Sequence, residues 1–370
     1  MHETSFVTLQ ATAFCNIDCS YCYLPNRDST DSMSLETLGA IFETLVSEQL
    51  VGESLSVTWH SGEPLVQPLA FFEEAFAKVR NVLRFVDLRQ SVQTNAVLVT
   101  PQHAELFLRE GVHVGVSIDG PAHLHDAARR DRAGHGTHAR TLAGMRLLRD
   151  AGVELGAICV VTRASLAQPA ELYSFFVEEQ VDRVSFLVEE VQGVHTESTL
   201  SGLAFDESLR VFYETMLELS ADKAGPRIVE LEFLEDVVSR GGCIAGNNLV
   251  EPLGTLNFDA RGGFGSFSPE LLESSGSSGE SFVVGNIKNG SIRSAFDSAS
   301  ARKIAAEVTR GVQACRETCE YFSFCGGGSP GSKQSEHGRL DITETENCRR
   351  SVKLLTETFL AREERSLGLA

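Results

Sequence analysis

Three cysteines near the N-terminus have a spacing that is typical of metal ligands. Cys15, Cys19 and Cys22 follow the pattern C-x3-C-x2-C in the segment CNIDCSYC. No histidine follows at a zinc-like offset, whereas a structural zinc ion needs four closed ligands. Three soft thiolates suit a four-iron cluster and leave one of its irons open for a further ligand. The spacing therefore predicts an iron–sulfur cluster with an open coordination position.

The remaining cysteines form one group and two single residues. Cys159 lies in the apolar segment LGAICVV and is expected in the core, and Cys243 is expected to be a buried thiol rather than a ligand. The odd total of nine cysteines argues against a disulfide scaffold. Spacing alone leaves the group open to either a zinc ion or a second iron–sulfur cluster. The group consists of Cys315, Cys319, Cys325 and Cys348.

The charge balance limits the partners of the chain. Its 370 residues include 32 Lys and Arg against 51 Asp and Glu, a formal net charge of −19. Such an acidic surface repels nucleic-acid phosphates and anionic lipid headgroups. No apolar run reaches the length of about 18 residues that a membrane span needs, and the N-terminus lacks the basic and apolar regions of a signal peptide. We expect a cytoplasmic protein that binds neither nucleic acid nor membranes.

Strand-like and helix-like segments alternate through the first two thirds of the chain. Six such β-α units in a row predict an α/β fold with a parallel sheet covered by helices. From about Ile228 the alternation stops, which predicts two domains, 1–227 and 228–370. Apolar runs predict strands at 5–12, 55–60, 91–95, 113–119, 153–162 and 183–190. Amphipathic periodicity predicts helices at 34–49, 70–83, 101–109, 137–151, 168–180 and 206–221.

Polar residues gather where these strands end. In parallel β/α barrels the functional groups lie at the carboxyl ends of the strands, so these residues are expected to face one cavity. Of two adjacent glutamates at the end of the sixth strand, only one can point inward. That carboxylate could take up a substrate proton or hold a basic side chain, although a solvated strand end explains it equally well. The residues are His60, Ser61, Gly62, Glu63, Gln93, Asn95, Ser117, Asp119, Glu189 and Glu190.

The cysteine motif, with Tyr21 before its last cysteine, resembles the radical S-adenosylmethionine (radical SAM) superfamily. The resemblance implies a partial (β/α)6 barrel, in which the open iron binds the amino and carboxylate groups of SAM. One electron from the cluster then splits the sulfonium and yields a 5′-deoxyadenosyl radical, which abstracts a hydrogen atom.

The same resemblance implies which residues contact SAM. Ser61-Gly62-Glu63-Pro64 is similar to the GGEP motif whose backbone holds the SAM amino group, with Ser61 in place of the first glycine. Arg129 stands where related enzymes direct an arginine at the SAM carboxylate. For His60 a turn-stabilising role is the alternative. The implied contacts are Tyr21, His60, Ser61, Gly62, Glu63, Gln93, Asn95, Ser117, Asp119 and Arg129.

The C-terminal third resembles the SPASM extension of peptide-modifying radical SAM enzymes, which normally has seven cysteines and two auxiliary clusters. Here only the distal set is present, as the four cysteines between 315 and 348. Ser329 occupies the place of a further cysteine, and GGFGSFSPE lacks the cysteine of a Gly-x4-Cys motif. The resemblance therefore implies one fully ligated auxiliary [4Fe-4S] cluster, which transfers electrons.

The segments FSPELLE, YFSFCGGGSPGSK and TETENC resemble the GrrM/OscB-type and related FxsB-type maturases, which form cyclophanes in ribosomally synthesised (RiPP) peptides. The implied reaction removes a hydrogen atom from a side-chain Cβ and joins that carbon to an aromatic ring. The implied partners are a precursor peptide and an external electron donor of the flavodoxin or ferredoxin type. Only fourteen residues precede Cys15, so we expect no N-terminal peptide-recognition domain.

Two other interpretations remain open on the sequence. An anaerobic sulfatase-maturase-like dehydrogenase would oxidise a residue to an aldehyde, and other peptide oxidation or epimerisation belongs to the same class. A protein that binds iron–sulfur clusters or zinc without catalysis would hold metal but would not cleave SAM.

Overall fold

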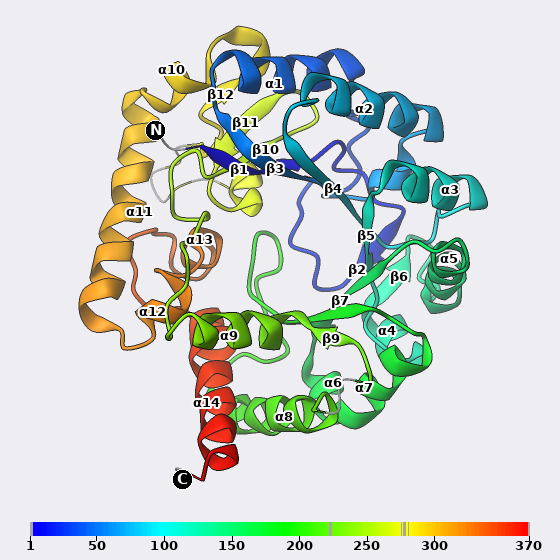
Figure 1. Ribbon diagram of the computed structural model, residues 1–370, viewed down its shortest axis with the longest axis vertical. Coiled ribbons are helices and arrows are strands. Elements are labelled where there is room, and N and C mark those ends of the chain that lie inside the picture. Colours follow the sequence, from blue (N-terminus) through cyan, green and yellow to red (C-terminus); the bar gives the residue numbers. More distant parts are fainter. Residues whose placement is uncertain (1–2, 222–223, 275, 277–278, 280, 369–370) are drawn as a thin grey trace.

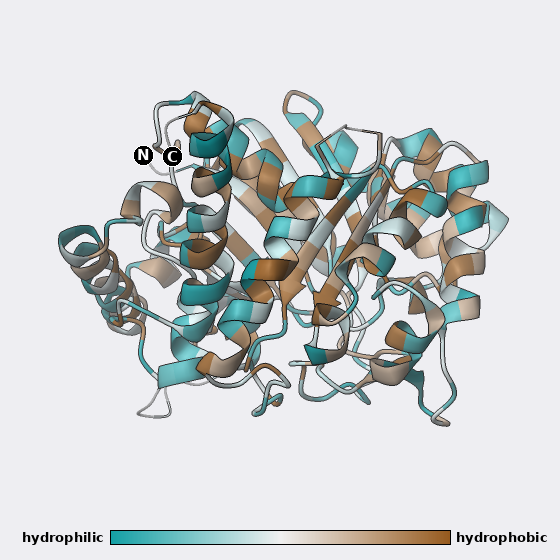
Figure 2. Ribbon diagram, turned by 90° about the horizontal axis from the view of Figure 1, so that it is seen from below, coloured by the Kyte–Doolittle hydropathy of each residue, from teal (hydrophilic) through white to brown (hydrophobic). Residues whose placement is uncertain are grey.

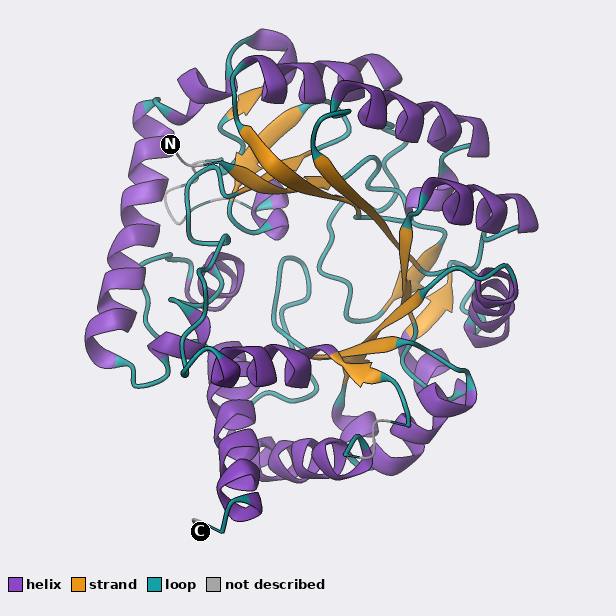
Figure 3. Ribbon diagram, viewed as in Figure 1, coloured by secondary structure: helices purple, strands orange, loops and turns teal. Residues whose placement is uncertain are grey.

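The computed structural model describes residues 3–221, 224–274, 276, 279 and 281–368. Within them the main sheet has ten strands in the order β12-β11-β10-β1-β3-β4-β5-β7-β8-β9, and β2 pairs separately with β6. Figures 1 and 3 show the sheet curving into an arc with helices along its outer side. The strands are β1 (Thr4–Leu9), β2 (Ile17–Cys19), β3 (Val51–Trp59), β4 (Asp87–Thr94), β5 (His113–Ser117), β6 (Arg129–Asp131), β7 (Leu155–Val161), β8 (Arg183–Val188), β9 (Arg227–Ile228), β10 (Thr255–Phe258), β11 (Gly263–Ser266) and β12 (Gly285–Asn286).

The predicted barrel is confirmed. Strands β1, β3, β4, β5, β7 and β8 pair in parallel with their neighbours, and they correspond to the six predicted strands. The barrel helices are α1 (Leu35–Ser47), α2 (Leu69–Val82), α3 (Pro101–Glu110), α4 (Ala122–Ala128), α5 (His138–Asp150), α6 (Arg163–Leu166), α7 (Pro169–Glu178) and α8 (Asp206–Leu219).

The C-terminal third continues the same sheet. Strand β10 pairs in parallel with β1, with Phe6 opposite Thr255, and β11 and β12 add antiparallel strands beyond it. Helices α11 to α14 lie across the open side of the arc (Figure 1). The domain boundary at 227/228 stays a prediction. The helices of this part are α9 (Val229–Ser239), α10 (Ile292–Phe296), α11 (Ala299–Thr318), α12 (Phe322–Cys325), α13 (Pro330–His337), a π-helix (Cys348–Leu354) and α14 (Leu355–Ser366).

Hydrophobic strands form the centre of the molecule, and the helices around them carry one hydrophobic side (Figure 2). Trp59, at the end of β3, is fully buried. Its ring contacts the rings of Phe71, Phe72 and Phe76 on α2 edge to face, with centroids 5.5–6.0 Å apart. This aromatic packing fixes the end of β3, from which the predicted site begins. None of the described helices is long and apolar enough to cross a membrane.

We predict that Phe72→Ala lowers the free energy of unfolding by about 3–5 kcal/mol, because it leaves a cavity beside Trp59. Urea unfolding followed by the fluorescence of Trp59, the only tryptophan of the chain, measures the loss. Phe85 is 87% exposed, so Phe85→Ala is the matched control and should change stability by under about 1 kcal/mol. Equal losses in both variants would contradict this account of the core.

Candidate active site

A cavity of about 380 Å³ lies at the carboxyl ends of the barrel strands. Of the barrel residues predicted to be functional, all line it except Glu63 and Asp119. The cavity also reaches residues of the C-terminal third that the sequence analysis did not select, namely Glu270, Ser329, Ser332 and Asn347. The predicted residues that line it are Cys15, Cys19, Tyr21, Cys22, His60, Ser61, Gly62, Gln93, Asn95, Ser117, Arg129, Glu189 and Glu190.

The three N-terminal thiols lie together at one end of this cavity. Cys15 is buried, and burial together with the neighbouring Cys19 and Cys22 raises its pKa to about 12. The pKa of Cys19 is raised to about 11, chiefly by burial. The amide of Asn95 donates to the Cys15 sulfur at 3.8 Å. Thiols with such raised pKa values become thiolates only when a metal replaces their protons.

The structure also offers a test of whether SAM and a cluster fit here. Among the described residues, no three His, Cys, Asp or Glu side chains are placed to hold a single metal ion, whereas the thiolates of a four-iron cluster bind different irons and stand apart. Buried polar atoms without partners lie along the cavity: Nδ1 of His60, Oγ of Ser61 and the hydroxyl of Tyr23. Buried polar groups normally have partners, so these atoms fit a polar ligand.

The turn after β3 brings its backbone close to the cysteine loop. Ser61 has φ +78° and Gly62 has φ +53°, conformations that favour glycine. A Cβ at Gly62 would lie 2.4 Å from the carbonyl oxygen of Phe14, and the amide of Glu63 donates to that same oxygen at 2.8 Å. The turn therefore packs against the cysteine loop, and Ser61 adopts the backbone geometry of the glycine that it replaces.

Glu63 lies beneath the cavity rather than on its wall. Its carboxylate accepts hydrogen bonds from the amides of Leu65 at 2.9 Å and Asn95 at 2.7 Å, and from the hydroxyl of Thr94 at 2.6 Å. Burial raises its pKa to about 7. These contacts tie the end of β3 to the end of β4, so Glu63 positions Asn95 instead of facing the cavity.

Arg129 reaches the cavity through a short ribbon that the sequence analysis did not predict. Strand β6 pairs with β2 so that Arg129 stands opposite Cys19. The buried guanidinium forms a two-pronged ion pair with Asp119, at 3.0 and 3.1 Å, and lies 4.0 Å from the Cys19 sulfur. Asp119 also accepts from the Tyr21 hydroxyl and from the amide of Val160. Asp119 thus holds Arg129 and Tyr21 in place from outside the cavity.

The strand ends next to this ribbon supply further polar groups. The amide of Gln93 on β4 donates to the Ser117 hydroxyl on β5 at 2.9 Å, and both residues line the cavity. Burial lowers the pKa of His60 to about 4, which leaves its ring neutral near pH 7.

The two glutamates after β8 have different environments. Glu189 accepts from His195 at 3.0 Å and from the amide and hydroxyl of Thr199, so it fixes the following loop. Glu190 accepts only from Ser332 on α13, at 2.9 Å, among the described contacts. Burial, with smaller contributions from Glu270 and Glu336, raises its pKa to about 7. Of these two glutamates, Glu190 is the one whose carboxylate keeps an oxygen without a partner among the described contacts.

The four C-terminal cysteines come together from separate elements. Cys315 lies near the end of α11, Cys319 caps that helix, Cys325 ends α12, and Cys348 begins the π-helix. Burial, with smaller contributions from the neighbouring thiols, raises the pKa of Cys315 and of Cys348. Cys325 and Cys348 line a second cavity of about 420 Å³, which shares Ser329, Ser332 and Asn347 with the first.

The predictions for the two single cysteines, Cys159 and Cys243, differ in outcome. Cys159 is fully buried, as predicted. Cys243 is exposed, so the prediction of a buried thiol is wrong. It follows the turn Gly241-Gly242 after α9, where two glycines with positive φ carry the chain over the surface.

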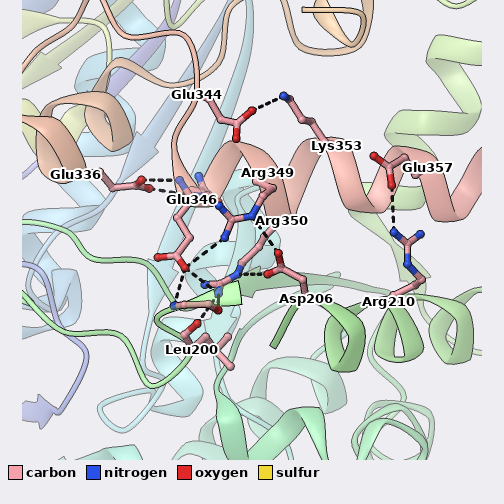
Figure 4. Close-up of polar contacts among 12 residues, drawn as sticks. Leu200, Asp206, Arg210, Glu336, Glu344, Glu346, Arg349, Arg350, Lys353 and Glu357 are labelled. Atoms are coloured by element: carbon pink, nitrogen blue, oxygen red, sulfur yellow. Dashed lines mark hydrogen bonds and ion pairs between the residues drawn. The ribbon is translucent and has the colours of Figure 1, made fainter. Parts of the chain in front are cut away.

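A dense polar network around Arg349 and Arg350 joins the π-helix to the barrel (Figure 4). Arg349 and Arg350 of the π-helix both bind the carboxylate of Asp206, at 3.0 and 3.1 Å. Arg350 is only 2% exposed and also donates to the carbonyl oxygens of Leu200 and Gly202. The network fixes the start of the π-helix, which bears Cys348, to the loop that precedes α8.

Comparisons with known proteins match the sequence and the fold of this chain. The profile of the Radical SAM superfamily matches residues 9–176. The protein sll1766 of Synechocystis sp. is 34% identical over 99% of this chain and 94% of its own length. A serine-type anaerobic sulfatase-maturating enzyme of Bacteroides thetaiotaomicron is 32% identical, and that match covers 51% of this chain and 49% of the relative. This chain thus spans about half the length of that sulfatase-maturating relative.

Solved structures show the same architecture. The structure titled anSMEcpe with bound AdoMet has a TM-score of 0.80 at 19% identity and covers 100% of this chain and 96% of its own. Streptococcus suis SuiB bound to its precursor peptide SuiA has a TM-score of 0.69 at 15% identity and covers 94% of this chain and 76% of SuiB. At these identities the likeness is one of fold.

The barrel and the family match define an enzyme that uses an iron–sulfur cluster together with SAM. The chain belongs to the radical SAM superfamily, with homology to anaerobic sulfatase-maturating enzymes and the fold of the SPASM-type, peptide-modifying members.

We predict that Arg129→Met lowers the free energy of unfolding by about 3–5 kcal/mol, because it leaves the carboxylate of Asp119 buried and unpaired. The double variant Asp119→Asn/Arg129→Met removes the stranded charge and should be more stable than Arg129→Met alone. Arg130 is the exposed neighbour on β6, and Arg130→Ala is the control with little effect. A double variant less stable than the single one would contradict the ion-pair account.

Proposed function

We propose that this enzyme modifies a ribosomally synthesised precursor peptide by joining a side-chain Cβ to an aromatic ring, which forms a cyclophane. Cys15, Cys19 and Cys22 hold the cluster that binds SAM. The other residues that line the cavity at the strand ends bind SAM and the target residue. The likeness to the fold of SuiB over 94% of this chain and 76% of SuiB, whose structure holds a precursor peptide, supports a peptide substrate.

The bound cofactors supply a carbon radical and take up one electron, and the chain's residues do the rest. The wall of the cavity must hold one Cβ–H bond of the peptide beside the ribose of SAM. A carbon radical is reactive toward many C–H bonds, so the position of the peptide decides which hydrogen is removed. The ion pair of Arg129 with Asp119 fixes a cationic group beside Cys19 before any ligand binds. A cation that is already held in place is suited to bind a carboxylate, such as the carboxylate group of SAM.

Glu190 takes up the proton that the aromatic ring loses when the new bond forms. Its carboxylate lies at the seam between the barrel and α13, where Asn347 donates to Ser332 at 3.2 Å and Ser332 in turn donates to Glu190. A raised pKa of about 7 is suited to a general base near neutral pH. Glu189, whose oxygens are already used by His195 and Thr199, positions the loop and does not take the proton.

Cys315, Cys319, Cys325 and Cys348 hold one auxiliary four-iron cluster that accepts the remaining electron. The observation that best supports a single auxiliary cluster is a contact between two hydroxyl groups. The Oγ atoms of Ser268 and Ser329 lie 3.3 Å apart. Ser329 stands where the two-cluster extension has a cysteine, and Ser268 belongs to the segment that lacks the other one. Ser268 also accepts from the amide of Gly331 at 3.0 Å. Among the described residues, that place offers hydroxyl groups instead of the thiolates that a second cluster would need, which supports a single auxiliary cluster.

The alternative is an aldehyde-forming dehydrogenase like the sulfatase-maturating enzymes. The 32% identity to the Bacteroides enzyme favours it. That match covers about half of each protein, whereas the likeness to the Synechocystis protein spans nearly the whole chain. In both reactions an external flavodoxin or ferredoxin would reduce the first cluster.

A peptide assay separates the two reactions. We predict that the reconstituted, reduced enzyme converts the peptide encoded beside its gene to a product two hydrogens lighter, whose fragments are missing between the two crosslinked residues. Mass spectrometry with fragmentation measures this, and a hydrazide probe detects aldehydes. The variant with Cys15, Cys19 and Cys22 replaced by Ala is the control and should yield neither product nor 5′-deoxyadenosine. A product that fragments normally and reacts with the probe would establish the dehydrogenase instead.

We predict that Glu190→Gln slows crosslinking by about 10²–10⁴-fold, the usual contribution of a general base. The wild-type rate should fall as the pH drops below about 7, because the carboxylate with its raised pKa is then protonated and cannot accept a proton. Single-turnover rates across the pH range measure both effects. Glu189→Gln is the matched control and should keep the acid limb of the profile. An acid limb that persists in Glu190→Gln would exclude Glu190 as the base.

A further inference from the structure

We propose that the ammonium group of Lys333 is a buried countercharge for the auxiliary cluster and raises its reduction potential. This inference rests on the proposed assignment of Cys315, Cys319, Cys325 and Cys348 to a four-iron cluster. It gives a role to a residue of α13 that touches neither the SAM end of the cavity nor the surface.

Lys333 is buried without a carboxylate partner. It is 3% exposed, and its Nζ lies 3.8 Å from the Cys315 sulfur, to which it donates. Among the described residues it forms no ion pair with Asp or Glu, whereas the nearby Lys353 pairs with Glu344. A lysine is almost never fully buried unless a negative charge compensates it. The Cys315 thiol is the only side chain that the described contacts offer to its ammonium group.

Gly311 makes room for this contact. Gly311 lies one turn before Cys315 on α11, and a Cβ there would stand 2.4 Å from the carbonyl oxygen of Leu340 and 3.2 Å from the Nζ of Lys333. A side chain at 311 would therefore displace the ammonium group from the sulfur. The segment GVQAC thus provides both the ligand and the space for the cation beside it.

The charge of a cluster with four thiolates explains the arrangement. Such a cluster is negative in both oxidation states, and reduction adds one more negative charge. A fixed cation at hydrogen-bond distance in a dry site stabilises the reduced form more than the oxidised form. The reduction potential therefore rises. A higher potential favours transfer of one electron from the crosslinked peptide to the oxidised cluster, while the ring proton goes to Glu190.

The test is a redox titration monitored by electron paramagnetic resonance. The background is the full chain with Cys15, Cys19 and Cys22 replaced by Ala, so that the auxiliary centre alone gives the signal. We expect Lys333→Met to make reduction at least tenfold less favourable, a downward shift of about 59 mV or more for one electron. Lys353→Met is the matched control. Its lysine is partly exposed and paired with Glu344, so a much smaller shift is expected. An unchanged potential in Lys333→Met would overturn the proposal.

Iron analysis covers the case in which Lys333→Met does not assemble the cluster. Lys333→Gln keeps a donor for the sulfur without the charge, and Lys333→Arg keeps the charge. If the cluster assembles in Lys333→Arg but not in Lys333→Met or Lys333→Gln, the positive charge is required, and the proposal is supported. Loss of iron in all three variants would overturn it in favour of a purely steric role. Neither measurement needs the peptide, so failure of the crosslinking proposal is a separate result. If the chain with Cys15, Cys19 and Cys22 replaced by Ala binds no iron instead of about four irons, the auxiliary cluster itself is absent.

Discussion

Three thiols gathered in one loop, of which Cys15 is buried and Cys19 and Cys22 are partly buried, set the constraint on which the rest of this structure depends. Burial raises the pKa of Cys15 and Cys19 far above the usual range of a thiol, so the thiolates form only when a metal takes the place of their protons. A negative cluster in such a place requires donors and cations that are already in position. Asn95 lies against Cys15 and Arg129 lies against Cys19. Arg129 is itself buried, which is tolerable only because Asp119 binds it with two hydrogen bonds.

The barrel and the C-terminal third meet at the other end of the same cavity. Strand β10 continues the sheet beside β1, and the network around Arg350 fixes the π-helix to the barrel. The proposed base Glu190 lies at this seam, hydrogen-bonded to Ser332 of α13. Both cavities reach Ser332, so a substrate radical would be formed, deprotonated and oxidised within a short path. Lys333, the next residue, turns toward the second group of cysteines. One short helix therefore serves both the proposed base and the proposed electron acceptor.

The sequence was sufficient to predict the parallel barrel, because its strands alternate between buried and partly exposed residues and its helices are amphipathic, and both patterns leave a strong periodic signal. It was also sufficient to place the strand-end residues in one cavity, since parallel strands end on the same edge. It did not reveal the β2–β6 ribbon, whose three-residue strands carry no periodicity, or the roles of Glu63 and Asp119 behind the wall. Strands β10 and β11 are short and buried along their whole length, so no alternation marked them as part of the sheet. Cys243 was misjudged because a lone cysteine gives no sign of its surroundings.

The proposed N-terminal cluster keeps one iron open, and SAM binds to that iron. Electron paramagnetic resonance of the reduced, reconstituted enzyme with and without SAM is the direct test. SAM is expected to change the spectrum of the wild-type chain and to leave that of the variant lacking Cys15, Cys19 and Cys22 unaltered. A wild-type spectrum that does not respond to saturating SAM would mean that no iron is open, and it would contradict the assignment of the site.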